Sequence, residues 1–157
     1  MRGDMTMILG VTLHVLCAVV WVGGMFFAHQ CLRPSVGGLE PAVRLPLWHR
    51  VFTRFFPWVW VAIIGLLASG YAMVFLGFGG FKGLALHINI MQGIGIIMML
   101  LYLHLYFSPW KRFRRAIAAG DLAVAAHNLG QIRQLVTINL VLGLVTIVVG
   151  ASGRYWG

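Results

Sequence analysis

Four of the six histidines in this chain lie within, or at the ends of, long apolar stretches: His14, His29, His87 and His104. An imidazole in hydrocarbon is costly unless something binds it, so such a residue predicts a function. Neutral imidazoles ligate transition metals and haem iron. We therefore take all four histidines as candidate cofactor ligands, and His14, His87 and His104 as candidate metal ligands.

Spacing and depth distinguish these histidines. His87 and His104 are 17 residues apart in the sequence, which is about 25 Å along a helix, so they cannot bind the same metal atom. If the first and third stretches run parallel, His14 pairs with His87 toward one face, and His29 pairs with His104 toward the other. His14 is the strongest candidate because it lies deepest in its stretch. We expect the site on the outer half of the protein, between the first and third spans.

The elements that must position these histidines are membrane spans. The 157 residues are 61% hydrophobic and 10% charged, whereas a soluble domain carries about 25% charged residues. A helix needs about 20 apolar residues to cross a bilayer. Residues 5–32, 55–78, 84–107 and 135–151 meet that requirement. The sequence therefore predicts an all-α protein, a four-helix bundle integral to the membrane, with residues 1–157 forming one domain.

The distribution of positive charge predicts the orientation of this bundle. The net charge of +9 could indicate nucleic acid, but the basic residues gather in two connections between spans. Nine lie on one side: Arg33, Arg44, Arg50, Arg54, Lys111, Arg112, Arg114, Arg115 and Arg133, against Arg2, Lys82 and Arg154 on the other. By the positive-inside rule both termini face the periplasm of a bacterial inner membrane. We expect lipid, not nucleic acid, as the partner of the basic connections.

The expected helix faces and boundaries follow from residue types. At 100° per residue the first span presents one stripe, His14, Cys17, Ala18, Trp21, Met25 and Ala28, which we expect to face the bundle. Small and polar residues mark similar faces on the second span (Ala62, Gly65, Ser69) and the fourth (Asn139, Gly143, Thr146, Gly150). Arg33-Pro34 is read as a helix stop.

Further boundaries lie in the basic connections. Residues 41–54 are read as an amphipathic cytoplasmic helix with Trp48 in the aromatic belt. Asp121 is read as the N-cap of a helix running into the fourth span. We expect His49 and His127 to be solvated.

Sulfur-containing residues give an alternative to haem. Met1, Met5 and Met7 cluster at the outer end, Met25, Met73, Met91, Met98 and Met99 lie in the spans, and Cys17 is on the His14 stripe. Thioether and thiolate ligands select Cu(I). Methionine in an apolar helix is, however, more often packing material. Cys17 is 14 residues from Cys31 on one helix, too far for a disulfide.

The three acidic residues, Asp4, Glu40 and Asp121, lie near span ends or in connections. An enzyme using Asp or Glu as acid or base within the membrane is therefore excluded. This exclusion does not extend to a membrane oxidoreductase, which is kept as an alternative.

The run LHVLCAVVWVGGMFF, Leu13 to Phe27, resembles the start of the copper-resistance D (CopD) membrane family. The same superfamily includes the HemJ-type protoporphyrinogen oxidases, four-helix membrane proteins that bind haem b. Leu86-His87-Ile88-Asn89 and Tyr102-Leu103-His104 resemble the two ends of their third span. The resemblance implies the same architecture and haem b at His14, His87 and His104. Asn89 stands where that pattern has a functional lysine, so porphyrin oxidation does not carry over.

Three functional hypotheses remain. The first is a haem b protein that acts in membrane electron transfer or haem handling, with quinone or a redox protein as partner. The second is a copper uptake or tolerance protein that uses Met, Cys and His. The third is a non-catalytic membrane subunit of a larger complex or homo-oligomer.

Overall fold

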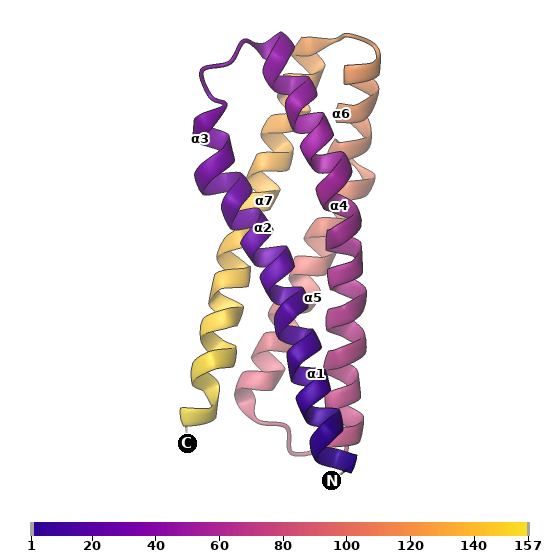
Figure 1. The fold of residues 1–157 in the computed structure, drawn as a ribbon, viewed down its shortest axis with the longest axis vertical. Helices are drawn as coiled ribbons and strands as arrows, with labels where there is room; N and C mark the ends of the chain where they lie inside the picture. Colours follow the sequence, from indigo (N-terminus) through magenta and orange to yellow (C-terminus); the bar gives the residue numbers. More distant parts are fainter. Residues whose placement is uncertain (1, 157) are drawn as a thin grey trace.

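The computed structural model describes residues 2–156 of the chain, and the side chains of residues 5–156. It consists of four long helical rods (Figure 1). The first rod is continuous: α1 (Arg2–Ala18), the π-helical segment η1 (Val19–Gly23), α2 (Gly24–Phe26), the π-helical segment η2 (Phe27–Leu32) and α3 (Arg33–Ser35). The second comprises α4 (Pro41–Ala72) and the π-helical segment η3 (Met73–Gly77). The third comprises α5 (Leu86–Phe107) and α6 (Pro109–Ala118), and the fourth comprises α7 (Leu122–Ser152) and the 3-10 turn η4 (Gly153–Tyr155).

All four rods contain a segment long and apolar enough to cross a membrane: Met5–Ser35, Pro41–Gly77, Leu86–Ala118 and Leu122–Tyr155. The predicted all-α four-helix membrane bundle is therefore confirmed. These segments have 31 to 37 residues, or about 46–56 Å at 1.5 Å per residue. A hydrocarbon core is about 30 Å thick, so the rods extend beyond it.

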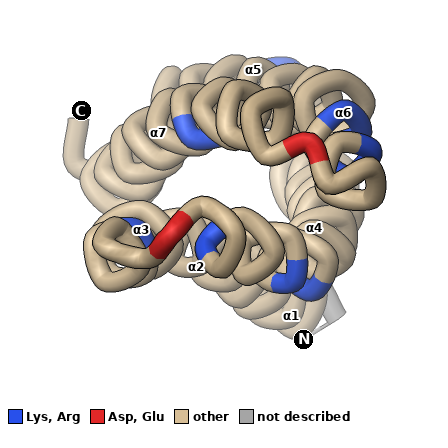
Figure 2. The backbone as a smooth tube through the Cα atoms, turned by 90° about the horizontal axis from the view of Figure 1, so that it is seen from above, with Lys and Arg blue, Asp and Glu red and all other residues tan. Residues whose placement is uncertain are grey.

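Both chain ends lie at one end of the bundle, and the two basic connections lie at the other (Figure 1). We call the second end, formed by residues 33–54 and 109–134, the basic end. Figure 2 looks onto it and shows lysine and arginine on the rods around it, with acidic residues at the connections. The side of the membrane that each end faces remains the prediction made from charge.

Three expected boundaries lie in the basic connections. The first helix continues one residue past the expected stop at Arg33-Pro34 and ends at Ser35. Proline has no backbone N–H, and its ring crowds the preceding helical turn. The π-helical turn η2 before Pro34 is wider than an α-helical turn and accommodates this ring. Residues 41–54 are helical from Pro41, as expected, and they continue without interruption into the second span, because α4 runs from Pro41 through Pro57 to Ala72. The expected start of α7 is confirmed: the Asp121 carboxylate accepts a hydrogen bond of 2.9 Å from the Val124 N–H.

The rods pack in two pairs. α1 packs along α4 and its extension η3, while α5 and α6 pack along α7. The fourth span turns its expected face inward: Asn139 and Gly143 are buried, and Thr146 and Gly150 are half-buried. A Cβ at Gly143 would lie 2.8 Å from Val22, so glycine lets the first and fourth rods approach closely.

An aromatic cluster that sequence reasoning missed fills the core toward the basic end. Phe56 contacts the rings of Phe52, Tyr102 and Trp110 at centroid distances of 5.1 to 5.8 Å. The Tyr102 hydroxyl donates a hydrogen bond of 3.0 Å to the Phe56 carbonyl, which joins the second and third rods. Trp48, expected in the aromatic belt, is only 2% exposed and belongs to this core. The buried face of this amphipathic stretch packs against other helices.

Candidate functional site

The interface between α1 and α4 brings together most of the chemically distinctive side chains. The two helices run antiparallel with a constant register: Cys17 meets Gly65, His14 meets Ser69, and Gly10 meets Met73. Contacts recur every three or four residues on both helices, as one face of an α-helix requires. The expected inward stripe of the first span is confirmed, because Cys17, Trp21 and Met25 are buried.

His14 is half-buried, and its Nδ1 lies 3.0 Å from the Ser69 hydroxyl oxygen. The Ser69 hydroxyl donates its own proton to the Gly65 carbonyl at 2.5 Å. A hydroxyl has one proton, so its oxygen accepts from His14 and Nδ1 carries the imidazole proton. The lone pair of neutral His14 is therefore on Nε2, the form in which imidazole binds a metal.

Glycine residues let the sulfur-containing side chains of this interface pack against the opposite helix. The Cys17 thiol lies directly against Gly65, and the Met7 thioether lies against Gly77. A Cβ at Gly10 would be 2.7 Å from Cγ of Met73.

Four potential soft-metal donors thus follow one another along one interface. They are Met7, Met73, His14 and Cys17, which we call the soft-donor row. Met7, Met73 and His14 are half-buried and Cys17 is buried.

The other predicted histidines do not join His14. His87 packs against Gly153 at the start of η4, and its ring centroid is 6.4 Å from that of Trp156. His104 is exposed in the last turn of α5. His29 lies 3.4 Å from an Arg33 nitrogen at the far end of the first rod.

The observed contacts of His14 are therefore with the second span and not with the third, where the site was expected. His14 faces the second span because α1 packs along α4. Within residues 5–156, no three side chains of the types His, Cys, Asp and Glu gather in a way that could hold a metal ion. Thioethers are outside that set, so the soft-donor row is a different kind of arrangement.

Two more expectations concern polar residues at the basic end. His127 is exposed, as expected, with Nε2 3.1 Å from the Gln131 amide nitrogen. His49 is not simply solvated: it is half-buried, with its ring stacked on Trp110 at 5.5 Å. An i, i+4 pattern from Trp48 to Phe52 and Phe56 could have indicated the packed face next to it.

The fold and this interface define a class: a multi-pass membrane protein with sulfur and imidazole donors between its first two spans. Residues 49–152 match the family model of CopD, copper resistance protein D, and the chain belongs to that family. The match covers most of α4 and the third and fourth rods, but not the first. Family membership and the four apolar rods agree with the predicted localisation as a multi-pass protein of the inner membrane.

A relative from Aquifex aeolicus (strain VF5), described as an uncharacterized protein, is 26% identical over 143 residues. That alignment covers 90% of this chain and 91% of the relative. No solved structure matches the chain.

Proposed function

We propose that this protein handles copper in the membrane and that Cu(I) is its cargo, held along the soft-donor row. The observation that carries the proposal is the row itself: two thioethers, an imidazole and a thiol on consecutive turns of one interface. Soft sulfur ligands select Cu(I) over harder cations. The description of the matched family, copper resistance protein D, supports the same cargo.

The spacing of the row favours passage of the ion over storage. Successive members are three or four residues apart, which is about 4.5–6 Å per step along a helix. An ion that is to move must be bound tightly enough to enter and loosely enough to leave, and several adjacent sites achieve this. Met7 is at the end of the row nearest the chain termini, where an ion from that side would first meet it. A path of this kind would serve either copper uptake or copper tolerance.

Ser69 supports the role of His14 as a ligand. A metal-binding histidine usually donates its other N–H to a partner that fixes the ring, and Ser69 accepts that bond here. Ser69 is only 3% exposed, so its position is fixed by packing.

Haem b is the second candidate, because the same free Nε2 of His14 would suit iron. The residues do not fit the ligation that the resemblance implies, however. His14 faces α4, His87 packs beside η4, and His104 is exposed. A haem held between His14 and a second histidine of the third rod therefore receives no support from these contacts.

Absorption spectroscopy and elemental analysis of detergent-purified protein distinguish these functions. The protein is produced in cells supplied with haem precursor, and a portion of the purified protein is then loaded anaerobically with Cu(I). We expect stoichiometric copper, no Soret band, and loss of copper in His14→Ala but not in His104→Ala, where the histidine is exposed. A Soret band that depends on His14, without copper, would favour haem b. Protein that contains neither copper nor haem and that co-purifies with other proteins would favour the third hypothesis, a structural subunit of a larger complex.

A further inference from the structure

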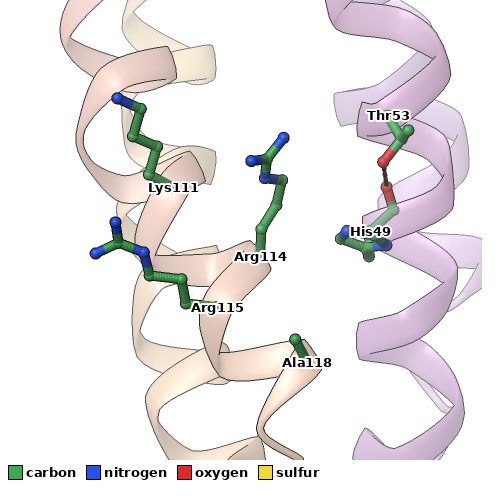
Figure 3. Close-up of a pocket in the computed structure, with 6 residues that line it drawn as sticks. All are labelled: His49, Thr53, Lys111, Arg114, Arg115 and Ala118. Atoms are coloured by element: carbon green, nitrogen blue, oxygen red, sulfur yellow. Dashed lines mark hydrogen bonds between the residues drawn. The ribbon is translucent and has the colours of Figure 1, made fainter.

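A second site candidate lies at the basic end, away from the soft-donor row. A cleft of about 480 Å³ separates α4 from α6 there. It is lined by His49 and Thr53 of α4 and by Lys111, Arg114, Arg115 and Ala118 of the α6 rod (Figure 3).

The cleft concentrates positive charge without an acidic residue in its lining. Of the two acidic residues whose side chains the structure describes, Asp121 caps α7 and Glu40 precedes α4. Lys111 and Arg114 rest on aromatic rings, with the Lys111 nitrogen 5.0 Å from the Phe107 centroid and the Arg114 guanidinium 5.7 Å from the Trp110 centroid. Figure 3 shows the Arg114 side chain in the space between α6 and α4, whereas the side chains of Lys111 and Arg115 point away from α4. No acidic side chain in the lining neutralises these cations.

The level of the cleft along the bundle indicates where its ligand comes from. Phe107 ends α5 and is 53% exposed, as expected of a ring in contact with lipid. Thr53 and His49 lie two and six residues before Phe55, where the second span was expected to begin. At 1.5 Å per residue they are about 3 and 9 Å beyond the hydrocarbon boundary. The headgroup region adds about 5–8 Å on each side of the hydrocarbon core, so Thr53 lies within this region and His49 lies at its outer edge.

We propose that this cleft binds the phosphate diester of an anionic phospholipid. Arginine recognises phosphate through paired N–H donors, and lysine contributes a mobile positive charge. Basic pockets between membrane helices bind anionic headgroups in this way. Inorganic phosphate offers the same chemistry, but the level of the cleft favours lipid.

The test measures lipid bound to the full-length protein in detergent by native mass spectrometry. Phosphatidylglycerol, phosphatidylcholine and inorganic phosphate are titrated separately into wild type, Arg114→Gln and the matched control Arg54→Gln. Arg54 is exposed on α4 next to Thr53 and does not line the cleft. Loss of any one charge near an anionic lipid weakens binding about fivefold. We expect Arg114→Gln to weaken phosphatidylglycerol binding about tenfold more than Arg54→Gln does, since it also removes a charge-assisted hydrogen bond.

Equal losses in the two variants would overturn the proposal, because they would indicate diffuse attraction to the basic end. Equal retention of phosphatidylcholine and phosphatidylglycerol would also overturn it. Binding of inorganic phosphate through Arg114 without retained lipid would overturn the assignment to a lipid. Unfolding temperatures of both variants in detergent check that they fold, and Arg114→Lys separates loss of charge from loss of the paired donors.

Discussion

The Nδ1 atom of His14 lies 3.0 Å from the hydroxyl oxygen of Ser69, across the interface of the first two membrane spans. This contact has two consequences. First, it joins α1 to α4 near the middle of their interface. Second, it leaves the lone pair of His14 on Nε2: because the Ser69 hydroxyl donates its proton to the Gly65 carbonyl, its oxygen accepts the proton on Nδ1 of His14. The contact thereby fixes the orientation of the imidazole.

Removal of the Ser69 hydroxyl should therefore weaken copper binding without removing a ligand. We expect Ser69→Ala to lower Cu(I) affinity about tenfold, the smaller end of the effect seen when an outer partner of a metal-binding histidine is lost. Competition with a chromophoric Cu(I) chelator measures this change. The matched control is Ser152→Ala, which removes only a hydroxyl bonded to the Val148 carbonyl of its own helix. An unchanged affinity in Ser69→Ala would mean that the Ser69 hydroxyl does not orient a metal ligand.

Close approach of α1 and α4 depends on Gly65. A methyl group at this position would collide with the Cys17 thiol, so we expect Gly65→Ala to lower the free energy of unfolding by about 1–3 kcal/mol. Gly93→Ala on α5 is the control, since nothing lies within 4 Å of a Cβ there. It should be neutral or stabilising by up to about 1 kcal/mol. Denaturant unfolding in micelles measures both values.

A second substitution sharpens that test. Cys17→Ala removes the atom that the new methyl group meets, so it should recover much of the stability lost in Gly65→Ala. If the double variant is as unstable as the sum of the two single variants, the Gly65–Cys17 contact does not determine the packing.

The hydrogen bond from Tyr102 to the Phe56 carbonyl joins the second and third rods inside the aromatic cluster. Tyr102→Phe keeps the ring and removes the donor. Hydrogen bonds between membrane helices contribute about 0.6 kcal/mol on average and about 1.7 kcal/mol at most, so we expect a loss of stability in that range. Tyr155→Phe, at a side chain that is 72% exposed, should have no measurable effect in the same unfolding assay.

The start of α7 can be tested at its cap. Asp121→Ala removes the acceptor of the Val124 N–H and should destabilise the protein by about 1 kcal/mol. Asp121→Asn retains an acceptor oxygen and should remain close to wild type. Equal destabilisation of the two variants would indicate that the charge of Asp121, rather than its cap, matters.

The sequence was sufficient to predict the helical architecture. Four apolar stretches, the inward stripe from His14 to Ala28 and the Asp121 cap are each set by local chemistry: hydrophobicity, helical periodicity and a side-chain acceptor. The extent of the helices was less predictable. Pro34 and Pro57 are conventional helix breakers, yet a preceding π-helical turn in one case and tertiary packing in the other keep the helix intact.

The partner of His14 could not be predicted, because helix pairing is a tertiary property. Depth along the membrane suggested His87, but depth does not determine which helices touch. The constant register of Gly65, Ser69 and Met73 with the first helix decides the pairing. The burial of His49 could not be predicted for the same reason, because Trp110, whose ring is stacked on it, lies 61 residues away in the sequence.

The proposed function requires that Cu(I) is held by sulfur and imidazole donors of the α1–α4 interface. X-ray absorption at the copper K-edge, on protein loaded anaerobically with one equivalent of Cu(I), tests it most directly. We expect sulfur scatterers together with imidazole, loss of the imidazole contribution in His14→Ala, and fewer sulfur scatterers in Cys17→Ser or Met73→Leu. Met99→Leu, on α5, should leave the spectrum unchanged. Copper surrounded only by nitrogen and oxygen, or a sulfur signal unaffected by Cys17 and Met73, would contradict the claim.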